Sequence, residues 1–144
     1  MSFLQRYLLV TIKGNSMEPT LLEGERYVSI LLGKSKEINR NDLVLFNNFD
    51  SVNPIDLKTS VVKRVIGVPG DYYGFNHMTK FYYLKGFPEL GLCWEVIPNG
   101  FFFVSSDNGL EGYGSMQWGL IPESRIFARI LRYQISDSLF SGLS

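Results

Sequence analysis

The chain has 144 residues, 45% of them hydrophobic, so it is as long as one ordinary domain and can bury a core without metals or disulfides. Its 14 basic and 14 acidic side chains cancel to a formal net charge of +0, which argues against DNA, RNA or an anionic membrane surface as a partner. Cys93 is the single cysteine, which excludes an intrachain disulfide or a cysteine-based metal cluster, and its neighbours Leu92 and Trp94 predict a buried, apolar thiol.

The first apolar run, Tyr7–Ile12, spans about six residues, whereas a helix that crosses a bilayer needs roughly 20 and the core of a secretory signal at least about 7. No membrane anchor or signal peptide is visible in the sequence. We therefore expect a bacterial cytoplasmic protein.

Seven short apolar segments separated by Gly, Pro, Asn and Asp clusters are predicted to be β-strands, because none keeps a helical period for more than about two turns. In chain order these segments are Tyr7–Lys13, Arg26–Leu32, Asp42–Asn47, Ser60–Val68, Lys80–Lys85, Phe101–Ser105 and Ile126–Tyr133. The polar stretch Asn47–Thr59 is expected to be an exposed loop, and Ser136–Ser144 a flexible C-terminal tail. We expect a mainly β fold in one domain that covers residues 1–135.

Ser16 lies in residues 14–20 (GNSMEPT), which follow the first predicted strand and enter a turn that contains Pro19. A serine nucleophile next to an oxyanion donor needs such a place at a strand end, with its backbone N–H free. A serine in a turn is more often a hydrogen-bonding turn residue, so Ser16 alone is weak evidence. Its hydroxyl also needs a base.

His77 is the single histidine and lies in the polar stretch Asn76–Thr79. A Ser-His-Asp triad would have to use it, but neither a neighbouring aspartate nor a nucleophile elbow of the G-x-S-x-G type supports that triad. We expect His77 to lie in a solvated loop, and the base has to come from another side chain.

Lys63 lies in residues 61–68 (VVKRVIGV), where Val61, Lys63 and Val65 share one face of the predicted strand. Burial among valines penalises the ammonium form and lowers the pKa of a lysine, which lets it act as a general base. From this segment alone, the simpler interpretation is a lysine whose stem packs on apolar neighbours while its ammonium group stays in water.

Four segments together resemble the boxes of type I signal peptidases. Residues 14–20 (GNSMEPT) resemble the nucleophile box of that family, and residues 63–71 (KRVIGVPGD) resemble its lysine box almost residue for residue. Between them, residues 41–46 (NDLVLF) are similar to the intervening strand box, and residues 98–108 (PNGFFFVSSDN) to the last box. The boxes occur in family order and cover most of residues 14–122.

This resemblance implies coiled, antiparallel β-sheets that form a partly closed barrel with few short helices. It implies a Ser/Lys dyad in which Ser16 attacks the scissile carbonyl and neutral Lys63 takes its proton and later delivers it to the leaving amine. The Ser16 N–H is the implied oxyanion donor. Some relatives have a second donor, a hydroxyl two residues earlier, but Gly14 stands there and leaves the number of donors open.

The resemblance also implies supporting residues and no cofactor or metal. Met17 and Pro19 shape the loop and the floor of the pocket, while Asp107 and Asn108 belong to a structural box that supports the active site.

The last box departs from the family pattern after Asn108. The family usually has a serine that touches the lysine, then an aspartate, a serine and an arginine. Those places hold Gly112, Gly114, Ser115 and Met116 here. Ser115, after a local shift, is the candidate to orient Lys63, and reduced activity or an inactive relative is an alternative.

Without a visible anchor, the chain is expected to process a soluble precursor bound as an extended strand. A small unanchored subgroup that this layout resembles is the maturation protease that trims the N-terminal extension of nickel-containing superoxide dismutase, in which the metal belongs to the substrate. Three alternatives remain: a general signal peptidase acting on exported precursors, a self-cleaving domain of the LexA type, and a non-catalytic β module that binds peptides.

Overall fold

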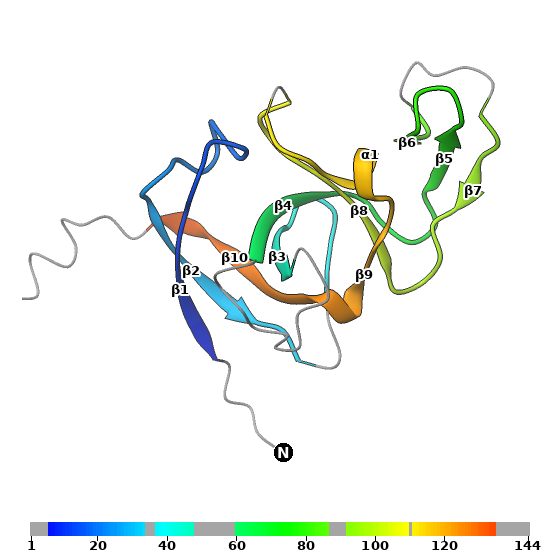
Figure 1. Cartoon of the computed structure of the whole chain (residues 1–144). Coiled ribbons are helices and arrows are strands. Elements are labelled where there is room, and N and C mark those ends of the chain that lie inside the picture. The colour runs from blue at the N-terminus through cyan, green and yellow to red at the C-terminus, as the bar shows by residue number, and fades with distance from the viewer. Residues whose placement is uncertain (1–5, 34–36, 48–59, 87–91, 110, 135–144) are drawn as a thin grey trace, which may run out of the picture.

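Two antiparallel sheets hold the strands of the chain (Figure 1). The structure is a computed structural model that describes residues 6–33, 37–47, 60–86, 92–109 and 111–134. In chain order the elements are β1 (Tyr7–Thr11), β2 (Arg26–Leu31), β3 (Leu43–Asn47), β4 (Ser60–Gly67), β5 (Tyr72–Asn76), β6 (Phe81–Leu84), β7 (Glu95–Val96), β8 (Phe101–Ser105), α1 (Ser115–Trp118), β9 (Ile121–Pro122), the 3-10 turn η1 (Glu123–Arg125) and β10 (Ile126–Gln134).

The larger sheet has the order β1-β2-β10-β3-β4-β8-β9, and the smaller one the order β6-β5-β7. In the larger sheet β1 and β4 are separated by three strands, yet residues of both line the same cleft. The sheet must therefore coil until its first strand approaches its centre, which is the coiled, partly closed arrangement expected from the sequence (Figure 1).

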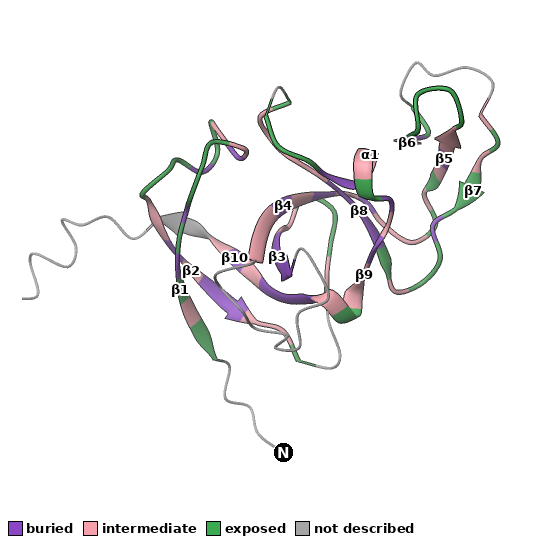
Figure 2. Ribbon diagram, viewed as in Figure 1, coloured by how far each residue is buried: buried purple, intermediate pink, exposed green. Residues whose placement is uncertain are grey.

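Burial along β4 alternates as the strand period requires, with Lys63, Val65 and Gly67 buried on one face (Figure 2). One core cluster lies under β1, β2 and β10 and includes Met17 and Leu21, each only 2% exposed. These two apolar side chains anchor the segment that carries Ser16 in the core.

All seven predicted strands are present, with ends that differ by at most two residues. The strands β5, β7 and β9 and the single turn α1 were not predicted. Residues 48–59 and 135–144, which hold most of the expected loop and the whole expected tail, lie outside the described residues, but Asn47 is the buried last residue of β3. Within the described ranges, the only α-helix is too short to cross a bilayer.

The prediction for Cys93 is wrong, because its side chain is exposed. The reason is that successive side chains in this segment point in alternate directions. A Cβ on Gly74 would lie 3.3 Å from atoms of both Leu92 and Trp94, so these two neighbours pack on β5 and the thiol between them points away.

Candidate active site

Ser16 lies in the segment that connects β1 to β2. Backbone hydrogen bonds from Ile12 N to Glu25 O and from Gly24 N to Ile12 O, both 2.9 Å, close this segment at its base. Ser16 is half-buried, directly before the buried Met17. Its backbone N–H donates to no group among the described residues, so the N–H that an oxyanion hole would use is free there.

Lys63 is 4% exposed, so its ammonium group does not stay in water and the simpler interpretation of its segment is wrong. Desolvation by burial lowers the pKa of Lys63. Its Nζ donates a 2.9 Å hydrogen bond to Ser106 Oγ. The amine is thus buried, shifted toward its neutral form and held by a hydroxyl.

The backbone of Gly112 brings these groups together. A Cβ built on Gly112 would lie 2.7 Å from Ser16 Cβ, 2.8 Å from Ser106 Oγ and 3.1 Å from Lys63 Nζ. Ser16 Cβ and Lys63 Nζ are therefore no farther apart than the sum of their two distances, so both side chains lie around the backbone of Gly112. Gly112 has φ 85, a conformation that glycine adopts without strain.

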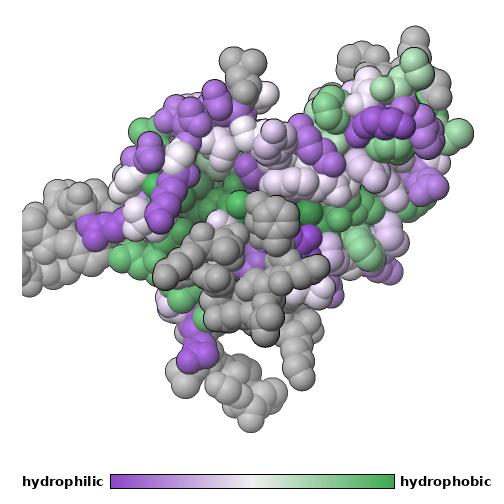
Figure 3. Space-filling model, in the orientation of Figure 1, coloured by the Kyte–Doolittle hydropathy of each residue, from purple (hydrophilic) through white to green (hydrophobic). Residues whose placement is uncertain are grey.

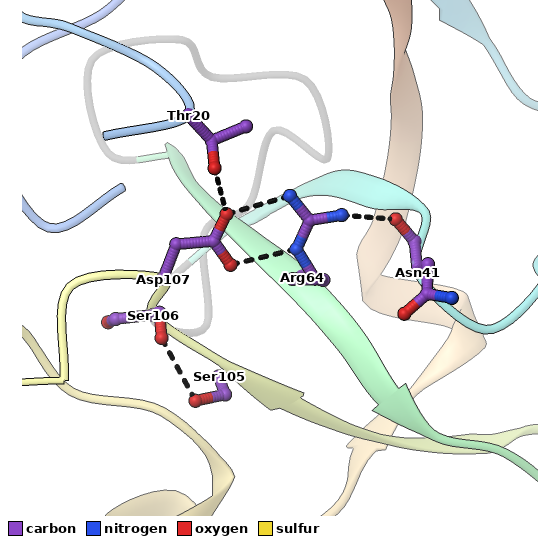
Figure 4. A network of polar contacts seen from close by, with 6 residues as sticks. All are labelled: Thr20, Asn41, Arg64, Ser105, Ser106 and Asp107. Carbon is purple, nitrogen blue, oxygen red and sulfur yellow. Dashed lines mark hydrogen bonds and ion pairs between the residues drawn. The ribbon is translucent and has the colours of Figure 1, made fainter. Parts of the chain in front are cut away.

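Asp107 ties the Ser16 segment to the Lys63 strand (Figure 4). Its carboxylate accepts from Arg64 Nε at 2.8 Å and Arg64 Nη2 at 2.7 Å, and also from the hydroxyl of Thr20. Arg64 Nη1 donates to Asn41 O at 2.8 Å. The site is therefore supported by an acid–arginine pair, Asp107 and Arg64. This pair does not occupy the places of the family's acid and arginine, where this chain has Gly114 and Met116.

Asn108 holds the Ser16 segment directly. Its backbone N–H donates to Ser16 O at 3.0 Å, and its Nδ2 donates to Asn15 O at 3.1 Å. Asp107 and Asn108 thus contact both parts of the candidate site, as a supporting box would.

Ser115 does not orient Lys63, so that expectation is corrected. Ser115 is fully buried in α1, and its Oγ accepts a 2.8 Å hydrogen bond from Val104 N. A Cβ on Gly114 would lie 2.8 Å from Val104 O, so the chain packs against β8 here and directs the Ser115 hydroxyl to the strand backbone.

The other predicted residues differ in their relation to the site. Met17 lines the cleft beside Ser16, whereas Pro19 follows a cis peptide bond and is exposed. Gly14 has φ 75, and a Cβ there would meet nothing within 4 Å. His77 is exposed in the turn between β5 and β6, as expected, and its ring lies edge-on to that of Phe75, with ring centroids 5.0 Å apart.

Sequence reasoning missed Ser106 and Arg64, although both lie inside the quoted boxes. Arg64 follows Lys63 directly, and Ser106 precedes Asp107. A charged residue beside Lys63 and an acid in the last box were a usable signal for the Arg64–Asp107 pair. The contact between Ser106 and Lys63 had no such signal, because it depends on the register of two strands.

A cleft of about 360 Å³ opens beside Ser16 and Lys63. Leu9–Lys13 line one side and Ser60–Lys63 the other, so apolar side chains share its walls with polar ones. Figure 3 shows apolar surface in the hollow between the β1 side of the molecule and its centre, with polar residues along the rim. Within the described ranges, no group of three His, Cys, Asp or Glu side chains could hold a metal ion.

Comparison with known proteins gives a consistent family. The family model described as signal peptidase, peptidase S26, matches residues 2–77, which include Ser16 and Lys63. Signal peptidase IB of Staphylococcus aureus is 31% identical over 147 residues, covering 83% of this chain and 73% of that protein. Probable signal peptidase I-2 of Synechocystis is 27% identical over 127 residues, covering 82% of this chain and 58% of that protein.

A crystal structure of a signal peptidase I from Enterococcus faecalis has a TM-score of 0.40 and 19% sequence identity, over 63% of this chain and 94% of that one. The family match spans more than half of the chain, and the Staphylococcus relative aligns with most of it. The chain therefore belongs to the signal peptidase, peptidase S26, family and is a serine endopeptidase of that family.

Proposed function

We propose that the chain removes an N-terminal leader or propeptide from a precursor protein, with Ser16 as nucleophile and Lys63 as general base. The observation that carries this proposal is the environment of Lys63. Its amine is buried, contacts no carboxylate among the described residues and lies with Ser16 around Gly112. A buried amine without an acidic partner is costly for stability, and catalysis by the neutral amine accounts for it.

In this mechanism the neutral Lys63 amine removes the proton of Ser16 Oγ as the oxygen attacks the scissile carbonyl. The free N–H of Ser16 donates to the oxyanion of the tetrahedral intermediate. The Lys63 ammonium then protonates the leaving amine, and the C–N bond breaks to leave an ester on Ser16. Water attacks that ester with Lys63 again accepting a proton, which releases the leader and restores Ser16.

Two strand edges support binding of the substrate as an extended strand. Leu8–Thr11 of β1 pair with β2 and Val61–Lys63 of β4 pair with β3, and no described strand pairs with the other edge of these two segments. Both segments line the cleft beside Ser16. A peptide added there would gain main-chain hydrogen bonds, and Met17 in the wall favours small side chains before the cut.

The preferred substrate is the precursor of a nickel-containing superoxide dismutase, a hypothesis that rests on the resemblance to its maturation protease. Relatives named signal peptidases favour exported precursors as the alternative. The match to the signal peptidase family favours cleavage of a separate precursor over the self-cleavage of a LexA-type domain. The cytoplasmic location and the single domain over residues 1–135 stay predictions.

The test is incubation of the purified chain with each of the two precursors, followed by mass determination of the new N-terminus. We expect one cleavage site in one precursor. Ser16→Ala and Lys63→Ala are each expected to lower kcat by about 10³-fold or more, because the two groups act as a unit.

His77→Ala is the control and is expected to leave kcat unchanged, because His77 is exposed in the turn between β5 and β6. Cleavage that survives in both Ser16→Ala and Lys63→Ala would show that the dyad is wrong. Saturable peptide binding without a product would favour the peptide-binding alternative.

A further inference from the structure

The hydroxyl that contacts Lys63 comes from an unexpected position. In the resembling family a serine at the place of Gly112 touches the lysine, whereas here Ser106, six residues earlier in the chain, makes that contact at 2.9 Å. Any side chain at residue 112 would start 2.8 Å from Ser106 Oγ. A hydroxyl from residue 106 and a side chain at residue 112 therefore compete for one space.

We propose that Ser106 is the positioning residue for Lys63, and that the missing side chain of Gly112 leaves the room that the Ser106 hydroxyl needs beside Lys63. This inference rests on the proposed role of Lys63 as the base. It deepens that role by assigning the orientation of the amine to a serine at residue 106 in place of the family serine at residue 112.

Strand register explains why Ser106 reaches Lys63. β4 and β8 are antiparallel, and Arg64 pairs with Ser105. One residue before Arg64 and one residue after Ser105, the same register places Lys63 opposite Ser106. Asp107, the following residue, is fixed by its two hydrogen bonds from Arg64 (Figure 4). The amine thus comes from the middle of β4 and the hydroxyl from the residue after β8, and the Arg64–Asp107 pair joins the two segments.

The contact restricts the orientation of the base. A neutral amine has two N–H groups and one lone pair, and proton transfer from Ser16 requires that lone pair to face the hydroxyl. Donation of one N–H to Ser106 Oγ fixes one of these three directions. The rotation of the amine that remains is limited further by the apolar wall around it.

The first experiment compares Ser106→Ala with the matched control Ser105→Ala. The Ser105 hydroxyl donates to the carbonyl of Ser106 at 3.1 Å rather than to Lys63. At a pH where Lys63 is neutral in every variant, Ser106→Ala is expected to lower kcat about 10- to 100-fold with an unchanged KM. Ser105→Ala is expected to stay within about twofold of the parent. Equal losses in the two variants, or no loss in Ser106→Ala, would overturn the proposal.

The second readout needs no cleavage and therefore separates this inference from the proposed function. An acceptor of the amine's hydrogen bond stabilises the ammonium form, so Ser106→Ala is expected to move the Lys63 titration, followed by NMR of its Cε, to lower pH. Ser105→Ala should not move it. A titration that is unchanged in Ser106→Ala would refute the contact even if Ser16→Ala proves that Ser16 is not the nucleophile.

The third measurement tests Gly112 by a double-mutant cycle. Gly112→Ala is strained at its positive φ and places a Cβ 2.7 Å from Ser16 Cβ, and both effects are the same whether residue 106 is serine or alanine. If Gly112→Ala acts by displacing Ser106, its effect on kcat is expected to be at least tenfold smaller in the Ser106→Ala background. If Gly112→Ala lowers kcat by the same factor in both backgrounds, the proposed role of Gly112 is wrong. Gly109→Ala, where a Cβ meets nothing within 4 Å, is the control and should leave kcat unchanged.

Discussion

At the scale of single residues, Lys63 trades stability for reactivity. Burial lowers its pKa, so more of the amine is neutral near neutral pH than for an exposed lysine. The same burial means that the folded chain binds a proton at Lys63 less tightly than the unfolded chain does. The proposed base is therefore expected to weaken the fold.

This trade predicts the effect of Lys63→Met, which keeps the side-chain length and removes the charge. The folded-state pKa lies below the unfolded value of about 10.4, so wild-type stability rises with pH between these two values. We expect the variant to gain about 1–2 kcal/mol in the free energy of unfolding at pH 7 and to lack that rise. Urea unfolding between pH 6 and 10 measures both. A variant less stable than the parent at pH 7 would contradict the argument.

The sequence was sufficient to single out Ser16 and Lys63 as candidates, because both lie in boxes that can be recognised from the sequence, and their roles stay predictions. It was not sufficient for Ser106, whose contact depends on which residue of β8 pairs with which residue of β4. The assignment of this role to Ser115 failed for a related reason. The close approach of Gly114 to Val104 directs the Ser115 hydroxyl to the strand backbone.

At the scale of elements, Asp107 joins β4, β8 and the segment between β1 and β2. Burial alone would raise the pKa of Asp107, but hydrogen bonds from Arg64 and Thr20 and the charge of Arg64 outweigh it and lower the pKa. The stability from this carboxylate is therefore present above its unfolded pKa of about 3.9 and is lost as pH falls through the folded value.

A double-mutant cycle of Arg64→Met and Asp107→Asn tests this joint. Each single change is expected to cost about 2–3 kcal/mol at pH 7, because it leaves a partly buried charged or polar group without its partner. The double variant should cost less than the sum, with a coupling of about 1–2 kcal/mol that vanishes at acid pH where the carboxyl is protonated.

The pair Arg40–Asp71 provides a matched control on another part of the fold. It is also doubly hydrogen-bonded, but its side chains are 50% and 30% exposed. We expect its coupling to stay below about 1 kcal/mol and its variants to cleave normally. Equal coupling energies in the two pairs would argue against a special role of Asp107.

The strands could be predicted because their apolar runs are bounded by turn residues. β5 was missed because Gly74 interrupts its run, and that glycine is needed where a Cβ would come within 2.9 Å of Cys93 O. The turn α1 is four residues long, which is too short for a helical period to appear in the sequence.

At the scale of the whole molecule, the two sheets meet around the end of β4. Leu84, Ile97 and Phe103 form one core cluster that includes residues of both sheets. Backbone hydrogen bonds from Gly70 N to Ile97 O and from Ile97 N to Asp71 O continue the junction at 3.0 and 2.7 Å. The sequence could not predict this division, because the pattern of a strand does not specify its sheet.

Gly67 is the closest point of this junction. A Cβ there would lie 2.7 Å from Leu84 Cδ2, 2.8 Å from Phe103 Cβ and 3.1 Å from Ile97 Cδ1. The Leu84 terminus can move aside, but Phe103 Cβ is fixed by the backbone of β8. Gly67→Ala is therefore expected to overpack the junction and to cost about 1–3 kcal/mol in the free energy of unfolding.

Gly67→Ala is expected to change kcat for precursor cleavage much less than it changes the free energy of unfolding. Lys63 lies four residues earlier on the same strand, about 13 Å away along the extended chain, so we expect kcat to change by less than about threefold. Urea unfolding and the precursor assay measure the two effects, with Gly33→Ala, where a Cβ meets nothing within 4 Å, as the control for both. If Gly67→Ala lost activity as strongly as Ser106→Ala while remaining folded, the junction would control the site, and the two sheets would have to be treated as one catalytic unit.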